Sequence, residues 1–168
     1  GVLEALPRWT PEAIPAEERL LLLENRAFEL LWALGCASEG LPALRARHAV
    51  LKTALDLALV RSLAQGDAPQ GAAARVAAAR ALGAPAGVPA WLVGAWDALS
   101  PVWDEALAWR MPGARVTHTE PLMPTWRTVV RAWCAVWWRE ACVGMRPEAP
   151  FARAAFAARR GSFARRVR

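Results

Sequence analysis

Apolar residues recur at helical spacing near the start of this chain. Between residues 15 and 35 they return every three or four positions, at Leu20, Leu23, Ala27, Leu30, Leu31 and Leu34. This spacing places them on one face of an α-helix, and that face should pack against the rest of the protein. Residues 15–35 are therefore predicted to form the first long helix.

The next segment, residues 42–65, is apolar around most of its circumference when it is drawn as a helix. Its apolar positions are Leu51, Leu55, Leu57, Ala58, Leu59, Val60 and Leu63. A helix that is apolar on nearly every side is typical of the centre of a domain. Lys52 and Asp56 are one turn apart in this segment, so their side chains should emerge together from an apolar band.

Proline and glycine mark the ends of the remaining helices, because proline is favoured in the first turn of a helix and glycine directly after its end. Gly83 ends one short helix, Pro89 starts another, and Ser100-Pro101 divides the latter into two. A last long helix should follow a loop and stop before Gly144. The predicted segments are 71–83, 89–99, 101–111 and 125–143, and the predicted fold is an all-α bundle of five to seven helices with short connections.

Composition agrees with this fold class. The chain has 168 residues, of which 55% are hydrophobic, and tyrosine is absent. That is enough apolar material for one domain, and the scarcity of β-branched residues favours helix over strand. The three cysteines, Cys36, Cys134 and Cys142, have no paired spacing, which favours a reduced, cytoplasmic protein. Charges interrupt every long apolar stretch, so no transmembrane helix is expected.

The net charge of +6 is concentrated at the C-terminus. Residues 146–168 contain seven arginines and one glutamate, whereas the other 145 residues contain fourteen basic and fourteen acidic groups. We therefore divide the chain into a helical domain, 1–145, and a basic tail, 146–168. The tail is expected either to be solvated or to make weak contact with a polyanion through phosphate groups. Its phenylalanines form no continuous apolar face of the kind that a membrane-surface helix needs.

Ten tryptophans are the second unusual feature of the composition, and eight of them lie between residues 91 and 138. Large rings can fill the space between alanine-rich helices, and their indole N–H groups could reach loop carbonyls at the edge of the bundle. Alternatively, tryptophan interleaved with arginine can stack on bases. A helical protein- or RNA-binding module that uses this half of the chain is therefore one functional hypothesis.

Most catalytic chemistry is disfavoured. The two histidines, His48 and His118, are not at metal-ligand spacing from each other or from a cysteine. The adjacent acidic pairs, Glu17-Glu18 and Asp104-Glu105, are expected on ordinary helix surfaces, and no phosphate-binding glycine loop occurs. His118 with Glu120 is a minor acid–base candidate. The chain alone is not expected to be catalytic or to hold a metal or cofactor.

Lys52 is the only lysine in a chain with twenty arginines. Three environments are open for it beside Asp56: a partly buried ion pair, a site facing a cleft, or a solvated pair of little energetic consequence. A compact ammonium charge suits contact with a phosphate or a carboxylate. A cleft site would explain why lysine occurs where arginine is otherwise used.

Residues 14–80 resemble the helical half that follows the catalytic domain of bacterial nucleotidyltransferase-like proteins. The matching residues are Asn25-Arg26 in the first helix, Lys52 and Asp56-Leu57 in the second, Gly66 after it, and Arg75 in the third. His48 stands where the family pattern has an aromatic residue, and Ala68 where it has tyrosine.

The resemblance implies a helical domain that shapes a nucleotide or acceptor site of a neighbouring domain. Ligand binding would involve Asn25, Arg26, Lys52, Asp56 and Arg75. The Gly-Ser motif and metal-binding carboxylates of that class would belong to a preceding α/β domain. Because the chain begins with Gly1 rather than methionine, a missing N-terminal catalytic domain or partner chain remains open.

Overall fold

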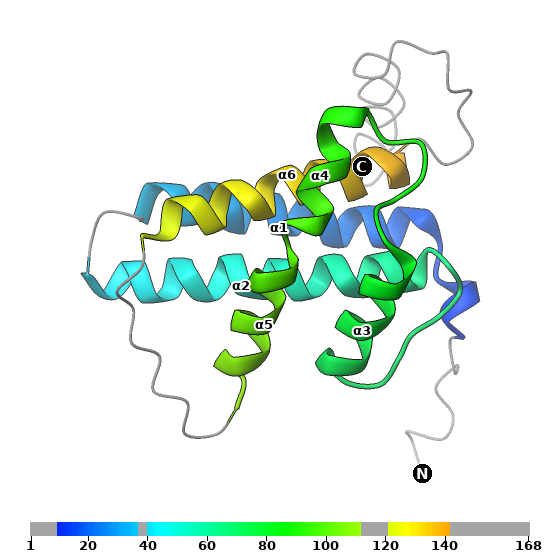
Figure 1. The fold of residues 1–168 in the computed structure, drawn as a ribbon, viewed down its shortest axis with the longest axis horizontal. Coiled ribbons are helices and arrows are strands. Elements are labelled where there is room, and N and C mark those ends of the chain that lie inside the picture. The colour runs from blue at the N-terminus through cyan, green and yellow to red at the C-terminus, as the bar shows by residue number, and fades with distance from the viewer. Residues whose placement is uncertain (1–9, 37–39, 112–120, 142–168) are drawn as a thin grey trace, which may run out of the picture.

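The computed structural model describes residues 10–36, 40–111 and 121–141, and within these residues it is all-α (Figure 1). It has no strand there, which confirms the predicted fold class. The helices are α1 (Ala16–Cys36), α2 (Gly40–Leu63), α3 (Ala72–Leu82), α4 (Ala90–Asp97), α5 (Ser100–Trp109) and α6 (Leu122–Ala141), and the short 3-10 helix η2 (Pro11–Ala13) precedes them.

The three longest helices are the three that the sequence pattern predicts. They contain 21 residues in α1, 24 in α2 and 20 in α6. Both α2 and α6 begin two or three residues earlier than predicted, so that Pro42 and Pro124 fall inside the first turn. The first backbone N–H groups of a helix have no partner within it, and proline is therefore tolerated there.

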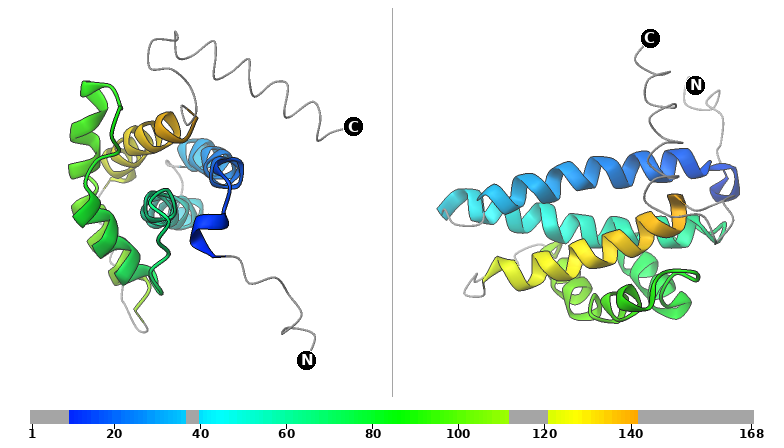
Figure 2. Two further views of the ribbon diagram at one scale, coloured as in Figure 1. Left: turned by 90° about the vertical axis from the view of Figure 1, so that its right-hand side faces the viewer. Right: turned by 90° about the horizontal axis from the view of Figure 1, so that it is seen from above.

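Helix α2 is the centre of the bundle, as its sequence predicts. It packs against α1, α3, α5 and α6, and the end-on view in Figure 2 shows it between them. Its side chains are buried on several sides: Ala46, Val50, Leu51, Ala54, Leu57, Ala58 and Val60 are each at most 2% exposed. Since neighbouring helices surround α2, an amphipathic pattern would have left polar groups in the core.

The apolar face of α1 is only partly buried. Leu20, Leu23 and Leu30 are at most 6% exposed, but Leu31 is 63% and Leu34 42% exposed. The prediction that all of these positions form the packed face is wrong for the last two. Helix α1 packs mainly on α2 and α6. These two helices cover a smaller part of its circumference than the part that carries apolar residues.

Helix α6 runs antiparallel to α1, and two indole groups fix their register. Trp126 Nε1 donates a hydrogen bond to the carbonyl oxygen of Leu30 at 2.8 Å, and Trp133 Nε1 donates to that of Leu23 at 2.8 Å. Both the donors and the acceptors are seven residues apart, which corresponds to two helical turns. At the far end of the pair, Arg19 Nε donates to Glu140 Oε2 at 2.7 Å.

On the side of α2 that faces α5, the packing is mainly by tryptophan side chains. Trp96 and Trp103 are at most 2% exposed and meet edge to face, with ring centroids 5.2 Å apart. Trp103 Nε1 donates to the Ala54 carbonyl of α2 at 2.8 Å. Core packing by tryptophan is confirmed for these rings, but the acceptors lie within helices rather than in loops. A helical carbonyl keeps a second lone pair, and alanine lets the ring approach it.

Candidate functional site

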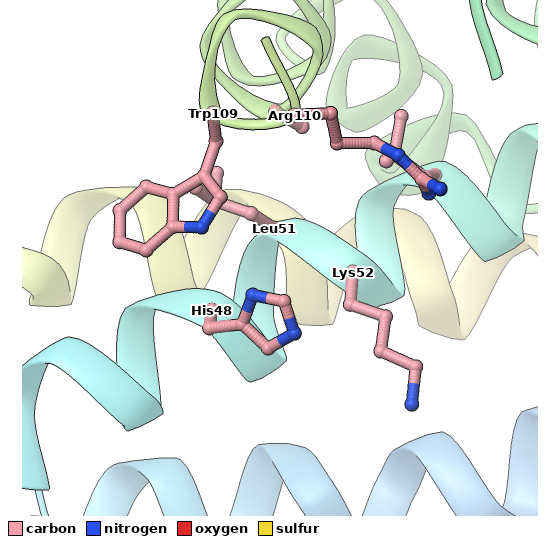
Figure 3. Close-up of a pocket in the computed structure, with 7 residues that line it drawn as sticks. His48, Leu51, Lys52, Trp109 and Arg110 are labelled. Atoms are coloured by element: carbon pink, nitrogen blue, oxygen red, sulfur yellow. The ribbon is translucent and has the colours of Figure 1, made fainter. Parts of the chain in front are cut away.

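A cleft opens between α2 and the C-terminal end of α5 (Figure 3). Its volume is about 420 Å³, within the range of about 300–1,000 Å³ that small-molecule sites occupy. It is lined by His48, Leu51, Lys52, Leu55, Ala106, Trp109 and Arg110. The sequence pattern pointed to one of these residues, Lys52, as a ligand contact.

Both walls of the cleft are helical faces. The lining residues of α2 lie at positions 48, 51, 52 and 55, and those of α5 at 106 and 109, which is the spacing of side chains on one side of a helix; Arg110 follows directly after α5. Trp103 joins the two helices through its bond to Ala54. Arg47 Nε also donates to Glu105 Oε1 at 2.5 Å, and the Arg47 side chain is only 8% exposed. These contacts hold the walls at a fixed separation.

Two cationic side chains occupy the cleft, one from each wall. Lys52 is 44% exposed at its side chain, and Arg110 is exposed directly after the last residue of α5. Beside them lie the rings of His48 and Trp109, whose centroids are 6.2 Å apart with an angle of 45° between the ring planes (Figure 3). An ammonium group, a guanidinium group and an aromatic surface together suit an anionic ligand that also has a flat apolar part.

A ladder of alternating charges joins α2 to α1 behind Lys52. Asp56 Oδ2 accepts from Arg26 Nε at 2.5 Å, and Glu29 Oε1 accepts from an Arg26 guanidinium nitrogen at 2.5 Å and from Lys52 Nζ at 3.3 Å. The expectation that Lys52 and Asp56 form a pair is therefore wrong: Asp56 pairs with Arg26, and Lys52 contacts Glu29. Because α1 lies alongside α2, its charges are closer partners than a side chain one turn away.

Lys52 is the least constrained member of this ladder. Its contact with Glu29 is longer than the two contacts made by Arg26, whose side chain is only 13% exposed. An ammonium group has three N–H donors, and one contact at 3.3 Å leaves donors for a ligand. Arg26 and Asp56 instead serve to fix α1 against α2.

The remaining predicted site residues lie apart from the cleft lining. Asn25 is exposed on α1. Arg75 is half-buried, and its Nε donates to the carbonyl oxygen of Pro69 at 3.0 Å, which closes the turn between α2 and α3. The structure thus brings Arg26, Lys52 and Asp56 together and places one of them in the cleft.

Sequence reasoning missed Trp109 and Arg110. Their signal is an aromatic residue followed by a basic one at the end of a short helix, just before a predicted loop. That signal is weak alone, because either residue could equally cover the surface of the bundle. Only the pairing of α5 with α2 shows that they face Lys52 and His48.

Other chemistry finds little support in the described parts of the chain. No group of three or more His, Cys, Asp or Glu side chains there could hold a metal ion. Burial raises the pKa of the Cys134 thiol, which keeps it protonated and a poor nucleophile at neutral pH. Asp104 and Glu105 pair with Arg80 and Arg47. His118, Glu120 and the tail 146–168 lie outside the described residues.

Among residues 10–36, 40–111 and 121–141, no helix has both the length and the apolar character needed to cross a bilayer.

Compared with known proteins, the chain matches no family model, and no curated protein or solved structure is significantly similar to it.

Proposed function

We propose that this protein is a non-catalytic helical domain whose α2–α5 cleft holds an anionic ligand for a neighbouring nucleotidyltransferase-like domain. The observation that supports the proposal is the placement of Lys52 and Arg110 on opposite walls, with Trp109 and His48 beside them. The ligand would be a nucleotide or the acceptor of a nucleotidyl group. The neighbouring domain would supply the metal ions and close the open side of the cleft.

Local charge makes the cleft distinct from the rest of the domain. Outside the tail, the basic and acidic groups balance, so the domain has no general attraction for phosphate. In the cleft, however, two cationic side chains line the same space, and the Glu29 carboxylate that Lys52 contacts is shared with Arg26. A phosphate or carboxylate group between Lys52 and Arg110 would accept charge-assisted hydrogen bonds from both.

The test is to titrate the 168-residue chain with ATP by calorimetry. Lys52→Met and Arg110→Met should each weaken binding about tenfold, which corresponds to the loss of one charge-assisted hydrogen bond. Trp109→Ala should weaken ATP binding but not the binding of inorganic tripolyphosphate, which has no base to stack.

Arg131→Met is the matched control, because Arg131 is exposed on α6 and its loss removes the same charge from a surface that does not line the cleft. ATP binding that responds equally to Arg131→Met and Lys52→Met would show diffuse attraction, and the proposal would be rejected. Absence of binding to ATP and tripolyphosphate would also reject it.

The alternative, a protein- or RNA-binding module that uses the tryptophan-rich half, has less support. Trp96 and Trp103 are buried, and Trp126 and Trp133 donate their N–H groups to α1. Trp91, at 70% exposed, is the tryptophan whose surface is most available for stacking among the described residues.

A further inference from the structure

The outermost side of α1 carries large apolar side chains. Phe28 is 72% exposed, Leu31 63%, Trp32 47% and Leu21 39%. These four positions, which we name the α1 outer face, follow one another at intervals of seven, three and one residues and so lie on one side of the helix. The outermost side of a surface helix is normally its most polar, so this face suits contact with another segment.

The charges around the α1 outer face are acidic. Glu17 and Glu18 are exposed in the first turn of α1, and Glu24 is half-exposed one turn before Phe28. The two arginines of α1 face other helices instead. Arg19 pairs with Glu140 at 2.7 Å, and Arg26 pairs with Asp56 at 2.5 Å. The outward surface of α1 is therefore both apolar and negatively charged.

The chain leaves α6 beside the N-terminal end of α1. Ala141 is the last described residue of α6, and the contact of Glu140 with Arg19 places it beside the first turns of α1. From Arg19 to Trp32 the distance along α1 is about 20 Å, at 1.5 Å per residue. The 27 residues from 142 to 168 are long enough to cover that distance in any conformation that is not tightly folded on itself.

The sequence of the tail complements the α1 outer face. Residues 146–168 carry seven arginines and one glutamate, together with Phe151, Phe156 and Phe163. We propose that this tail docks in cis on the α1 outer face, with its phenylalanines against Phe28, Leu31 and Trp32 and its arginines beside Glu17, Glu18 and Glu24. The other surface close to its origin, the outward side of α6, carries exposed Arg127, Arg131 and Arg139 and would repel it.

Site-specific photo-cross-linking tests the docking in the full chain. A photoreactive phenylalanine analogue is placed at position 28, and in a matched protein at position 91, since Phe28 and Trp91 are 72% and 70% exposed on different helices. Irradiation at position 28 should give an adduct within one chain, and mass spectrometry should locate its second end in residues 146–168. Position 91 should give at least severalfold less of this adduct.

Three outcomes would overturn the proposal. An adduct between two chains would mean that a second copy covers the face, while no adduct at position 28, or equal yields at 28 and 91, would mean that the tail does not dock there. Glu17→Arg with Glu18→Arg should lower the yield severalfold, as should high salt. Both glutamates are exposed, and circular dichroism will verify that this variant remains folded.

Discussion

Arg26 and Lys52 share the carboxylate of Glu29, yet they differ in how much water surrounds them. The Arg26 side chain is 13% exposed and joins two carboxylates, whereas that of Lys52 is 44% exposed and joins one. One oxygen of Glu29, Oε2, is buried without a hydrogen-bond partner among the described residues. The stability of the α1–α2 contact should therefore depend on Arg26 rather than on Lys52.

We expect Arg26→Met to lower the free energy of unfolding by about 2 kcal/mol, because it leaves the partly buried Asp56 unpaired and leaves Glu29 with only its longer contact to Lys52. Lys52→Met should change it by no more than about 0.5 kcal/mol, as is typical of an exposed ion pair. Urea denaturation of the two variants measures both values. Equal losses would show that Lys52 has the same structural role as Arg26, and the separation of roles would be wrong.

The sequence predicted which residue would lie in the cleft better than it predicted the partners of that residue. Lys52 was identified from its rarity and its place in an apolar band, and the structure does place it in a cleft. Its partner was misassigned because a sequence shows only neighbours along one helix. The register of α1 against α2 decides that Glu29 rather than Asp56 faces the ammonium group. In the same way, Arg110 lines the cleft only because α5 packs against α2, and the sequence does not show that contact.

At the level of helices, α1 and α6 are joined by two equivalent indole hydrogen bonds. Because the donors Trp126 and Trp133 are seven residues apart, the two bonds are about 10 Å from each other along the helix axes. Each bond leaves the regular backbone bonding of α1 intact, since it uses the second lone pair of a carbonyl. The two bonds should therefore contribute independently to the packing of α6.

Trp126→Phe and Trp133→Phe keep an aromatic ring but remove the donor, so each should cost about 1 kcal/mol of unfolding free energy. The double variant should lose the sum of the two values to within about 0.5 kcal/mol, because the sites do not touch. Trp91→Phe, at an exposed position, serves as the control and should change stability by less than either. A double variant no worse than one single variant would contradict independent bonds.

Helix boundaries were the most predictable part of the structure, and helix environments were less so. Proline and glycine located all three long helices to within a few residues because these residues act on the local backbone. The apolar pattern of α1 overestimated its buried face, since Leu31 and Leu34 are exposed. How many neighbours surround a helix is a property of the bundle, and local spacing does not determine it.

At the scale of the whole molecule, the packing of the described helices is centred on α2 and is weaker at α4. Leu57 of α2 is fully buried and belongs to the main core cluster. Leu92 of α4 is also buried, but it lies outside that cluster, which α4 joins through Trp96, and α4 packs mainly on α6. In α4 the indole N–H of Trp96 is buried without a partner among the described residues, which costs about 1–3 kcal/mol. Helix α4 is therefore the helix expected to open first.

Native-state hydrogen exchange can test this order of stability. Amides of α4 should exchange through a local opening of lower free energy than the global unfolding that exposes α2. Leu57→Ala should lower the protection of the slowest α2 amides by about 2–5 kcal/mol, the usual cost of a large cavity. Leu92→Ala weakens only the packing of α4, so it can lower the protection of the α2 amides by no more than the free energy of α4 opening. Once that free energy is lost, the domain with α4 detached is the ground state, and its unfolding is no longer affected by the substitution. If α4 and α2 amides exchanged with equal free energies in the unmodified protein, the bundle would unfold as one unit.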